Sequence, residues 1–207
     1  MHVHADGGRK RRKIDDAEAR AAWVVTERIS NVIGRIFGED REGEGNDTAT
    51  TLDDVMDAIR VDVEEKNYFV TGDFSCPGVY REDCEFVDDF SSFRGFKRFR
   101  QNLYALKLFT ESYDVEILSF QMEGDGAAVE TRAFVRLNLL LPWRPVLAWV
   151  WKVRHSIDAV THGEDGESVV YRVVRHTESW EIDSTKGVEL LLKPGPEAKW
   201  PWRWSKR

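Results

Sequence analysis

The sequence is poor in cysteine and has no long apolar run. Its 207 residues contain two cysteines, Cys76 and Cys84, against eight tryptophans and eleven phenylalanines. The spacing of the cysteines matches no common zinc motif, and two cysteines make a poor disulfide framework, so we expect free thiols. No apolar stretch is long enough to span a bilayer, and no signal-peptide core follows the basic start. We therefore expect a soluble protein without metal, cofactor or transmembrane segment.

Positive charge is scarce in the body of the chain. Residues 1–13 carry five Lys or Arg and one Asp, and residues 197–207 carry four and one Glu, whereas the whole chain has a net charge of −7. The acidic body argues against nucleic-acid binding by the main domain. The basic cluster at residues 9–13 is most simply solvated charge, with a nuclear import signal or a phosphate-binding arm as alternatives.

The chain divides into five predicted regions: a basic arm over 1–13, an amphipathic helix over 14–38, a charged flexible linker over 39–50, a main domain over 51–193 and a Pro/Trp-rich tail over 194–207. The helix is predicted from apolar residues at helical spacing, namely Ile14, Ala17, Ala21, Val25, Ile29, Val32 and Ile36. It is expected to pack on the domain or on a partner.

Helices come first in the main domain and strands follow. Helical spacing covers residues 51–67 and 93–110, with a turn-rich connection over 68–77 and an extended piece over 78–87 between them. Alternation predicts strands over 113–122, 127–141, 146–159 and 168–183, before a short helix over 185–192. This order predicts an α+β fold with helices covering one face of a strongly bent antiparallel sheet.

Two alternating stretches, residues 146–159 and 168–183, predict a β-hairpin at the centre of the domain. The Asp165-Gly166 pair between them suits a type I′ turn, in which both central residues need φ > 0. With this turn, the apolar faces of the two strands match. The facing pairs are Trp149 with Ile182, Trp151 with Trp180, His155 with His176, and Ile157 with Val174.

Four polar residues on the inner face of this hairpin are the candidates for chemistry: His155, His176, Glu178 and Arg172. A histidine beside a carboxylate can act as a base near neutral pH, and two histidines with a glutamate could ligate zinc. A structural hydrogen-bond network is the simpler interpretation, because buried polar residues are usually paired.

Four tryptophans could complete a binding site: Trp143, Trp149, Trp151 and Trp180. They suit a flat apolar ligand, because ligand pockets are typically aromatic with a few polar groups. The alternative is that they fill the core.

Three motifs, residues 93–103 (FRGFKRFRQNL), 141–145 (LPWRP) and 176–181 (HTESWE), resemble the uncharacterised plant and cyanobacterial branch of the nuclear transport factor two-like (NTF2-like, SnoaL-like, ketosteroid-isomerase-like) superfamily. The resemblance covers about residues 52–192. It implies a conical α+β domain whose sheet curls around a pocket, frequently dimeric, in a branch without an assigned activity. Plant relatives are commonly plastid proteins.

From these observations we expect a domain that binds a small hydrophobic molecule in the cone and that is non-enzymatic or has an unassigned activity. One alternative is a non-catalytic interaction or dimerisation module within a larger assembly. The other is an isomerase, dehydratase or cyclase that uses His176 as its base.

Overall fold

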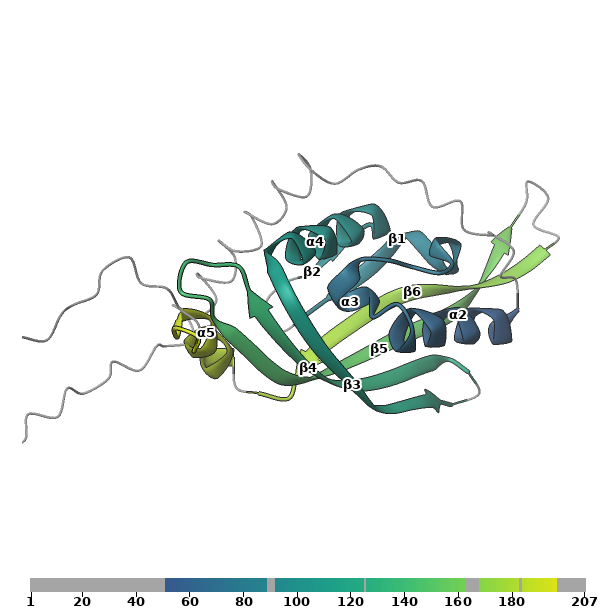
Figure 1. The fold of residues 1–207 in the computed structure, drawn as a ribbon. Coiled ribbons are helices and arrows are strands. Elements are labelled where there is room, and N and C mark those ends of the chain that lie inside the picture. The colour runs from purple at the N-terminus through teal and green to yellow at the C-terminus, as the bar shows by residue number, and fades with distance from the viewer. Residues whose placement is uncertain (1–50, 89–91, 125, 163–167, 183, 197–207) are drawn as a thin grey trace, which may run out of the picture.

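The computed structural model describes residues 51–88, 92–124, 126–162, 168–182 and 184–196 (Figure 1). The predicted basic arm, N-terminal helix and linker lie outside the described residues, as do the Asp165-Gly166 turn and the end of the tail. Within the described ranges, no helix is long and apolar enough to cross a membrane.

Three helices lie on one side of a curved sheet, and a fourth lies near the end of strands β4 and β5 (Figure 1). They are α2 (Leu52–Glu64), α3 (Tyr68–Thr71), α4 (Phe96–Phe109) and α5 (Ser184–Leu192). A capping box fixes the start of α2. The Asp54 N–H donates to the Thr51 hydroxyl at 3.2 Å, and the Thr51 N–H donates to the Asp54 carboxylate at 3.0 Å.

The sheet has six strands in the order β2-β1-β6-β5-β4-β3. They are β1 (Tyr80–Val87), β2 (Ser92–Arg94), β3 (Thr110–Glu123), β4 (Ala128–Leu139), β5 (Val146–His162) and β6 (Ser168–Trp180), with a 3-10 turn, η1 (Pro77–Val79), before β1. The strand pairs are antiparallel, as predicted, except that β1 pairs with β6 in parallel. Sequence alternation reports which residues are extended but not which strands are neighbours.

The helix predicted over 93–110 begins three residues later than expected. Residues 92–94 form β2 instead, and Gly95 follows with φ 110°. A backbone with this φ cannot continue a right-handed helix, so α4 starts at Phe96.

The central hairpin has the predicted register over its inner half. Trp151 pairs with Trp180 and His155 pairs with His176, which confirms the two pairs that define the candidate site. Cross-strand neighbours of this kind have Cβ atoms about 5 Å apart, so the two imidazoles meet inside the sheet. Because β6 ends at Trp180, the predicted pair of Trp149 with Ile182 is not part of the ladder.

A β-bulge changes the register towards the hairpin turn. Ile157 pairs with Val173 rather than with Val174, and Arg172 pairs with Asp158. The extra residue on β6 moves Arg172 to the opposite face of the sheet from His176, so its predicted inner position is wrong. The sequence concealed the bulge because valines occupy both faces of this stretch.

The core lies between the three helices and the concave face of the sheet. On β4 the apolar residues at odd-numbered positions are buried, namely Val129, Ala133, Val135, Leu137 and Leu139. From α2 the side chains of Val55, Ile59 and Val63 reach the same core. The cone therefore holds one continuous apolar interior, into which the candidate polar residues project.

Candidate functional site: a tyrosine and two histidines inside the cone

Tyr68 joins the two histidines at the centre of the cone. Its hydroxyl lies 2.8 Å from Nε2 of His176 and 3.2 Å from Nε2 of His155. All three side chains have no solvent exposure. A phenol has one hydrogen to donate, so Tyr68 donates to one imidazole and accepts from the other. The two histidines are therefore held as opposite tautomers.

The four-residue helix α3 brings Tyr68 into the cone. It is bracketed by two residues in the left-handed region, Asn67 at φ 48° and Gly72 at φ 69°. These turns let three consecutive buried residues, Tyr68, Phe69 and Val70, enter the hollow of the sheet. Sequence reasoning missed Tyr68 by reading this stretch as a turn. The available signal was an apolar run flanked by Asn and Gly, which tolerate positive φ best.

Glu178 lies beside the network, but its carboxylate is not within hydrogen-bonding distance of His176. Its Oε1 is 3.6 Å from Nδ1 of His176, longer than a hydrogen bond allows. Its side chain is 12% exposed, so the carboxylate is at the edge of the buried centre. The predicted grouping of His155, His176 and Glu178 is therefore present, with Tyr68 added.

Burial keeps the whole network neutral. It lowers the pKa of His155 to about 3. It also lowers the pKa of His176 well below its ordinary value, and the neighbouring His155 adds to this shift. Burial likewise raises the pKa of Tyr68 well above its ordinary value, with Glu178 and Asp62 contributing. Histidines with such pKa values are poor bases at neutral pH.

Three of the four predicted tryptophans form a wall next to this network. The rings of Trp149 and Trp180 stack with centroids 4.8 Å apart, and Trp151 lies 5.8 Å from Trp149. Trp151 also packs on Phe69 of α3 at 5.4 Å, which connects the wall to the helix that carries Tyr68.

The fourth tryptophan, Trp143, is held in the connection between β4 and β5. Its indole N–H donates to the Leu191 carbonyl of α5 at 2.7 Å. The indole N–H of Trp143 therefore holds α5 in place, and Trp143 has a structural role.

The interior contains many polar atoms without a protein partner. Among the described residues, these buried atoms are Asp62 Oδ2, Tyr80 Oη, Asn102 Oδ1, Thr131 Oγ1, the Nε1 atoms of Trp149 and Trp151, and the Nδ1 atoms of His155 and His176. Each unpaired group costs about 1–3 kcal/mol, and native proteins hold few of them. The cone therefore has unused hydrogen-bonding capacity, although this conformation leaves no exposed surface on either histidine.

Asp62 is a second titratable group that sequence reasoning missed. The Ser75 N–H donates to its Oδ1 at 2.5 Å, and burial raises the pKa of the carboxyl to about 6. It stands three residues after Ile59 on the apolar stripe of α2. An acid on the buried stripe of a helix was the signal that could have found it.

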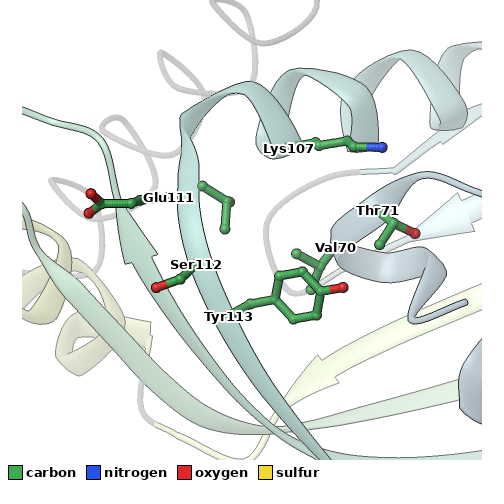
Figure 2. Close-up of a pocket in the computed structure, with 7 residues that line it drawn as sticks. Val70, Thr71, Lys107, Glu111, Ser112 and Tyr113 are labelled. Atoms are coloured by element: carbon green, nitrogen blue, oxygen red, sulfur yellow. The ribbon is translucent and has the colours of Figure 1, made fainter. Parts of the chain in front are cut away.

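An open groove lies next to α3 (Figure 2). It has a volume of about 380 Å³ and is lined by Val70, Thr71, Lys107, Thr110, Glu111, Ser112 and Tyr113. In Figure 2 the ring of Tyr113 lies beside Val70. Val70 directly follows Phe69, the residue that contacts Trp151. None of the predicted tryptophans lines this groove.

The zinc alternative finds no support in the geometry. Within the part of the chain that the structure describes, no three His, Cys, Asp or Glu side chains gather as a metal site. Both Nε2 atoms already face the Tyr68 hydroxyl.

Several solved structures are similar to this chain. An LEH-like epoxide hydrolase of M. tuberculosis is 21% identical over 69% of this chain and 94% of its own, with a TM-score of 0.46. An NTF2-like protein of unknown function from Burkholderia pseudomallei is 12% identical over 66% and 95%, with a TM-score of 0.45. A ketosteroid isomerase-like protein of Catenulispora acidiphila is 15% identical over 70% and 95%, with a TM-score of 0.44. No curated protein matches the sequence.

The helices on a strongly curved mixed sheet, with the site enclosed between them, give the domain the conical α+β architecture that the sequence predicts. The sequence profile of one family, described as "Uncharacterized conserved protein (DUF2358)", matches residues 53–173. The chain belongs to this family.

Proposed function

We propose that the cone binds a small, flat and mainly apolar molecule that carries at least one hydrogen-bonding group. The observation that carries this proposal is the set of buried polar atoms without partners, which lie among aromatic side chains around Tyr68. A ligand that satisfied some of these atoms would recover part of the free energy that their unpaired state costs. Its apolar body would pack against Trp151 and Phe69.

The chemistry of the interior indicates an uncharged ligand with an acceptor group. The unpaired Nε1 atoms of Trp149 and Trp151 can only donate, so an ether, carbonyl or hydroxyl oxygen suits them. Neutral histidines offer no opposite charge to an anion, and Glu178 would repel one.

Entry of the ligand requires α3 to move, because the histidines have no exposed surface. The groove in Figure 2 lies against α3 at Val70 and Thr71. Its Lys107 is paired with Asp73 at 3.5 Å, across the end of the same helix. We infer that this groove is the route by which a ligand reaches the Trp wall.

One further expectation is disfavoured and another remains a proposal. A homodimer through the outer sheet face is disfavoured by the ion pairs Arg132–Glu181 at 2.6 Å and Lys152–Glu130 at 2.7 Å, which a dimer would have to desolvate. A plastid location is supported by the family resemblance, and expression of a fluorescent fusion in plant cells tests it.

Catalysis with His176 as base is the weaker alternative. The closeness of Glu178 favours it, since a carboxylate can orient an imidazole. The lowered pKa values of both histidines oppose it. Binding therefore explains the network better than proton abstraction does.

The test is native mass spectrometry of the full chain purified from its own source, followed by denaturation and identification of the released molecule. We expect a stoichiometric neutral compound in the wild type and at least about tenfold less of it in Tyr68→Phe, because without the phenol both histidines lose the hydrogen bonds that fix their positions and tautomers, at a cost to the site of about 1.4 kcal/mol or more. Tyr104→Phe removes the same hydroxyl from α4 and is the matched control. An empty wild-type protein, or equal retention by both variants, would refute the proposal.

A further inference from the structure

We propose that the free edge of β3, over residues 112–117, binds an extended segment of another protein as an added strand. In this segment apolar residues alternate with Lys or Arg. The proposal concerns the edge of the sheet and does not depend on ligand binding in the cone.

The two edges of the sheet differ in how they are protected against pairing with another chain. β2, at one edge, has three residues, whereas β3, at the other edge, has fourteen. Within the described ranges, no strand pairs with the outer side of β3. Native proteins protect such an edge with short strands, Lys, Pro or bulges, because its free N–H and C=O groups can pair with another strand. β3 is long and contains neither Lys nor Pro.

Two bulges in β3 determine which part of its edge is open to a regular partner. The register of β3 on β4 shifts between Thr110 and Ser112, and again between Ile117 and Ser119. Between the bulges, residues 112–117 pair with β4 without interruption. A stretch of this length is enough for one added strand, since strands usually have about 3–10 residues.

The side chains of this stretch differ between the two faces of the sheet. Tyr113, Val115 and Ile117 pair with buried residues of β4 and lie on the inner face, and Tyr113 is 40% exposed. Asp114 and Glu116 alternate with them and are exposed on the outer face. An extended partner has the same alternation, so it can place apolar side chains beside the inner row and other side chains beside the two acids.

The charges on the outer face favour a basic partner. The side chain of Asp114 is 71% exposed, and its 3.9 Å ion pair with Arg136 is weak because both groups are in water. Glu116 is exposed and forms no ion pair with a described residue. Lys or Arg at the neighbouring positions of an added strand would form favourable cross-strand pairs with both acids.

A second copy of this chain fits the edge poorly. Two copies of residues 112–117 could pair antiparallel with their apolar faces on the same side of the sheet. In the registers that align most of this stretch, Asp114 then lies opposite Asp114 or Glu116 of the second copy. Like charges directly opposite one another are destabilising, so the acids disfavour self-association.

The groove beside α3 gives the added strand room for a side chain. Its volume is about 380 Å³, and four residues of β3 line it together with Val70 and Thr71. In Figure 2 the ring of Tyr113 points towards α3, whereas Glu111 and Ser112 lie on the other side of the strand. An apolar side chain on the inner face of the added strand would pack there. In strand addition, backbone hydrogen bonds provide affinity, and pockets for alternate side chains provide specificity.

Binding of synthetic peptides to the full chain tests the proposal. The probe is a fluorescein-labelled peptide of alternating Val and Lys, and its control contains the same residues with every Val before every Lys. We expect the alternating peptide to bind at least about tenfold more tightly in fluorescence anisotropy, because it alone presents apolar and basic side chains on opposite faces. Equal affinities of the two peptides would overturn the proposal.

Charge reversal on β3 tests the part played by the acids. Asp114→Lys with Glu116→Lys should weaken binding of the Val-Lys peptide by at least about tenfold and should favour an alternating Val-Glu peptide instead. Glu65→Lys with Glu82→Lys makes the same change in net charge at exposed positions on other elements. This control should weaken binding by at most about twofold, because salt screens distant charges. An equal loss in both variants would count against the edge.

Methylation of the peptide backbone distinguishes strand addition from contact through side chains alone. Alternate N–H groups of a strand point to opposite edges, so methylation of one alternate set blocks pairing with β3 and methylation of the other set does not. We expect one methylated Val-Lys peptide to lose at least about tenfold in affinity and the other to keep it. Equal affinities would exclude an added strand. If the chain alone sedimented as a dimer with slowed amide exchange in residues 112–117, the edge would belong to a second copy and the proposal would be wrong.

Discussion

At the scale of single residues, the site is governed by burial without charge. Two imidazoles, a phenol and nearby indoles are enclosed in an apolar cone, and the pKa values of the imidazoles and the phenol move in the directions that favour neutral forms. A single protonated phenol holds both histidines. Position and hydrogen bonding, rather than charge, are what these side chains offer to a ligand.

Asp62 is the residue whose ionisation should be visible in stability. Its pKa rises from 3.8 to about 6 in the folded protein, so the folded state holds a proton that the unfolded state has released. The free-energy cost of ionising this buried carboxyl is therefore absent below about pH 4, grows as pH rises towards 6 and is complete above that. A shift of roughly two units corresponds to about 3 kcal/mol.

We expect Asp62→Asn to remove this penalty while keeping an acceptor for the Ser75 N–H. The variant should gain up to about 3 kcal/mol over the wild type between pH 4 and pH 7, measured by urea unfolding at each pH. Asp57→Asn on the exposed side of the same helix is the control. If the difference in unfolding free energy between Asp62→Asn and the wild type did not change with pH, the pKa of Asp62 would not be raised in the folded protein.

At the scale of elements, the features that depend on local turn residues and on periodicity could be predicted from the sequence. The α2 cap at Thr51, the inward positions of β4 and the facing of His155 with His176 follow from local pattern. The bulge at Val174 could not be predicted, since valines allow either register. Tyr68 was missed for a different reason, because a four-residue helix is too short to show a period.

The contact between α2 and the turn after β3 can be tested with two glycines. A Cβ on Gly126, at φ 92°, would lie 2.2 Å from Leu52 Cδ2, whereas one on Gly124, at φ 60°, meets nothing within 4 Å. Both positions strain an alanine, so their difference reports the clash. We expect Gly126→Ala to be less stable than Gly124→Ala by about 1–3 kcal/mol in thermal or urea unfolding. Equal losses would mean that Leu52 moves aside freely.

At the scale of the whole molecule, the free-energy cost of burying polar groups is concentrated inside the cone. The outer sheet face carries solvent-exposed ion pairs. The inner face carries groups that are neutral in the folded protein and whose protonation differs in the unfolded chain. The strand order that creates this inner face brings β1 beside β6 through a parallel pairing, which periodicity alone does not encode. Stability of the entire domain should therefore depend on the protonation of the cone.

The histidine pair gives the clearest test of that dependence. The pKa of His155 falls from 6.5 to about 3 on folding, so below pH 6.5 the unfolded chain takes up a proton that the folded cone excludes. The unfolding free energy is therefore unaffected by this group above pH 6.5 and decreases as pH falls towards 3, by about 3 kcal/mol at pH 4.5. We expect His155→Gln, which keeps a group facing Tyr68, to flatten the fall in unfolding free energy between pH 7.5 and 4.5. Thr177→Gln, on the reverse face of β6, should shift stability equally at every pH. If both variants kept the wild-type slope, His155 would titrate normally, and the neutral cone on which the binding proposal rests would have to be abandoned.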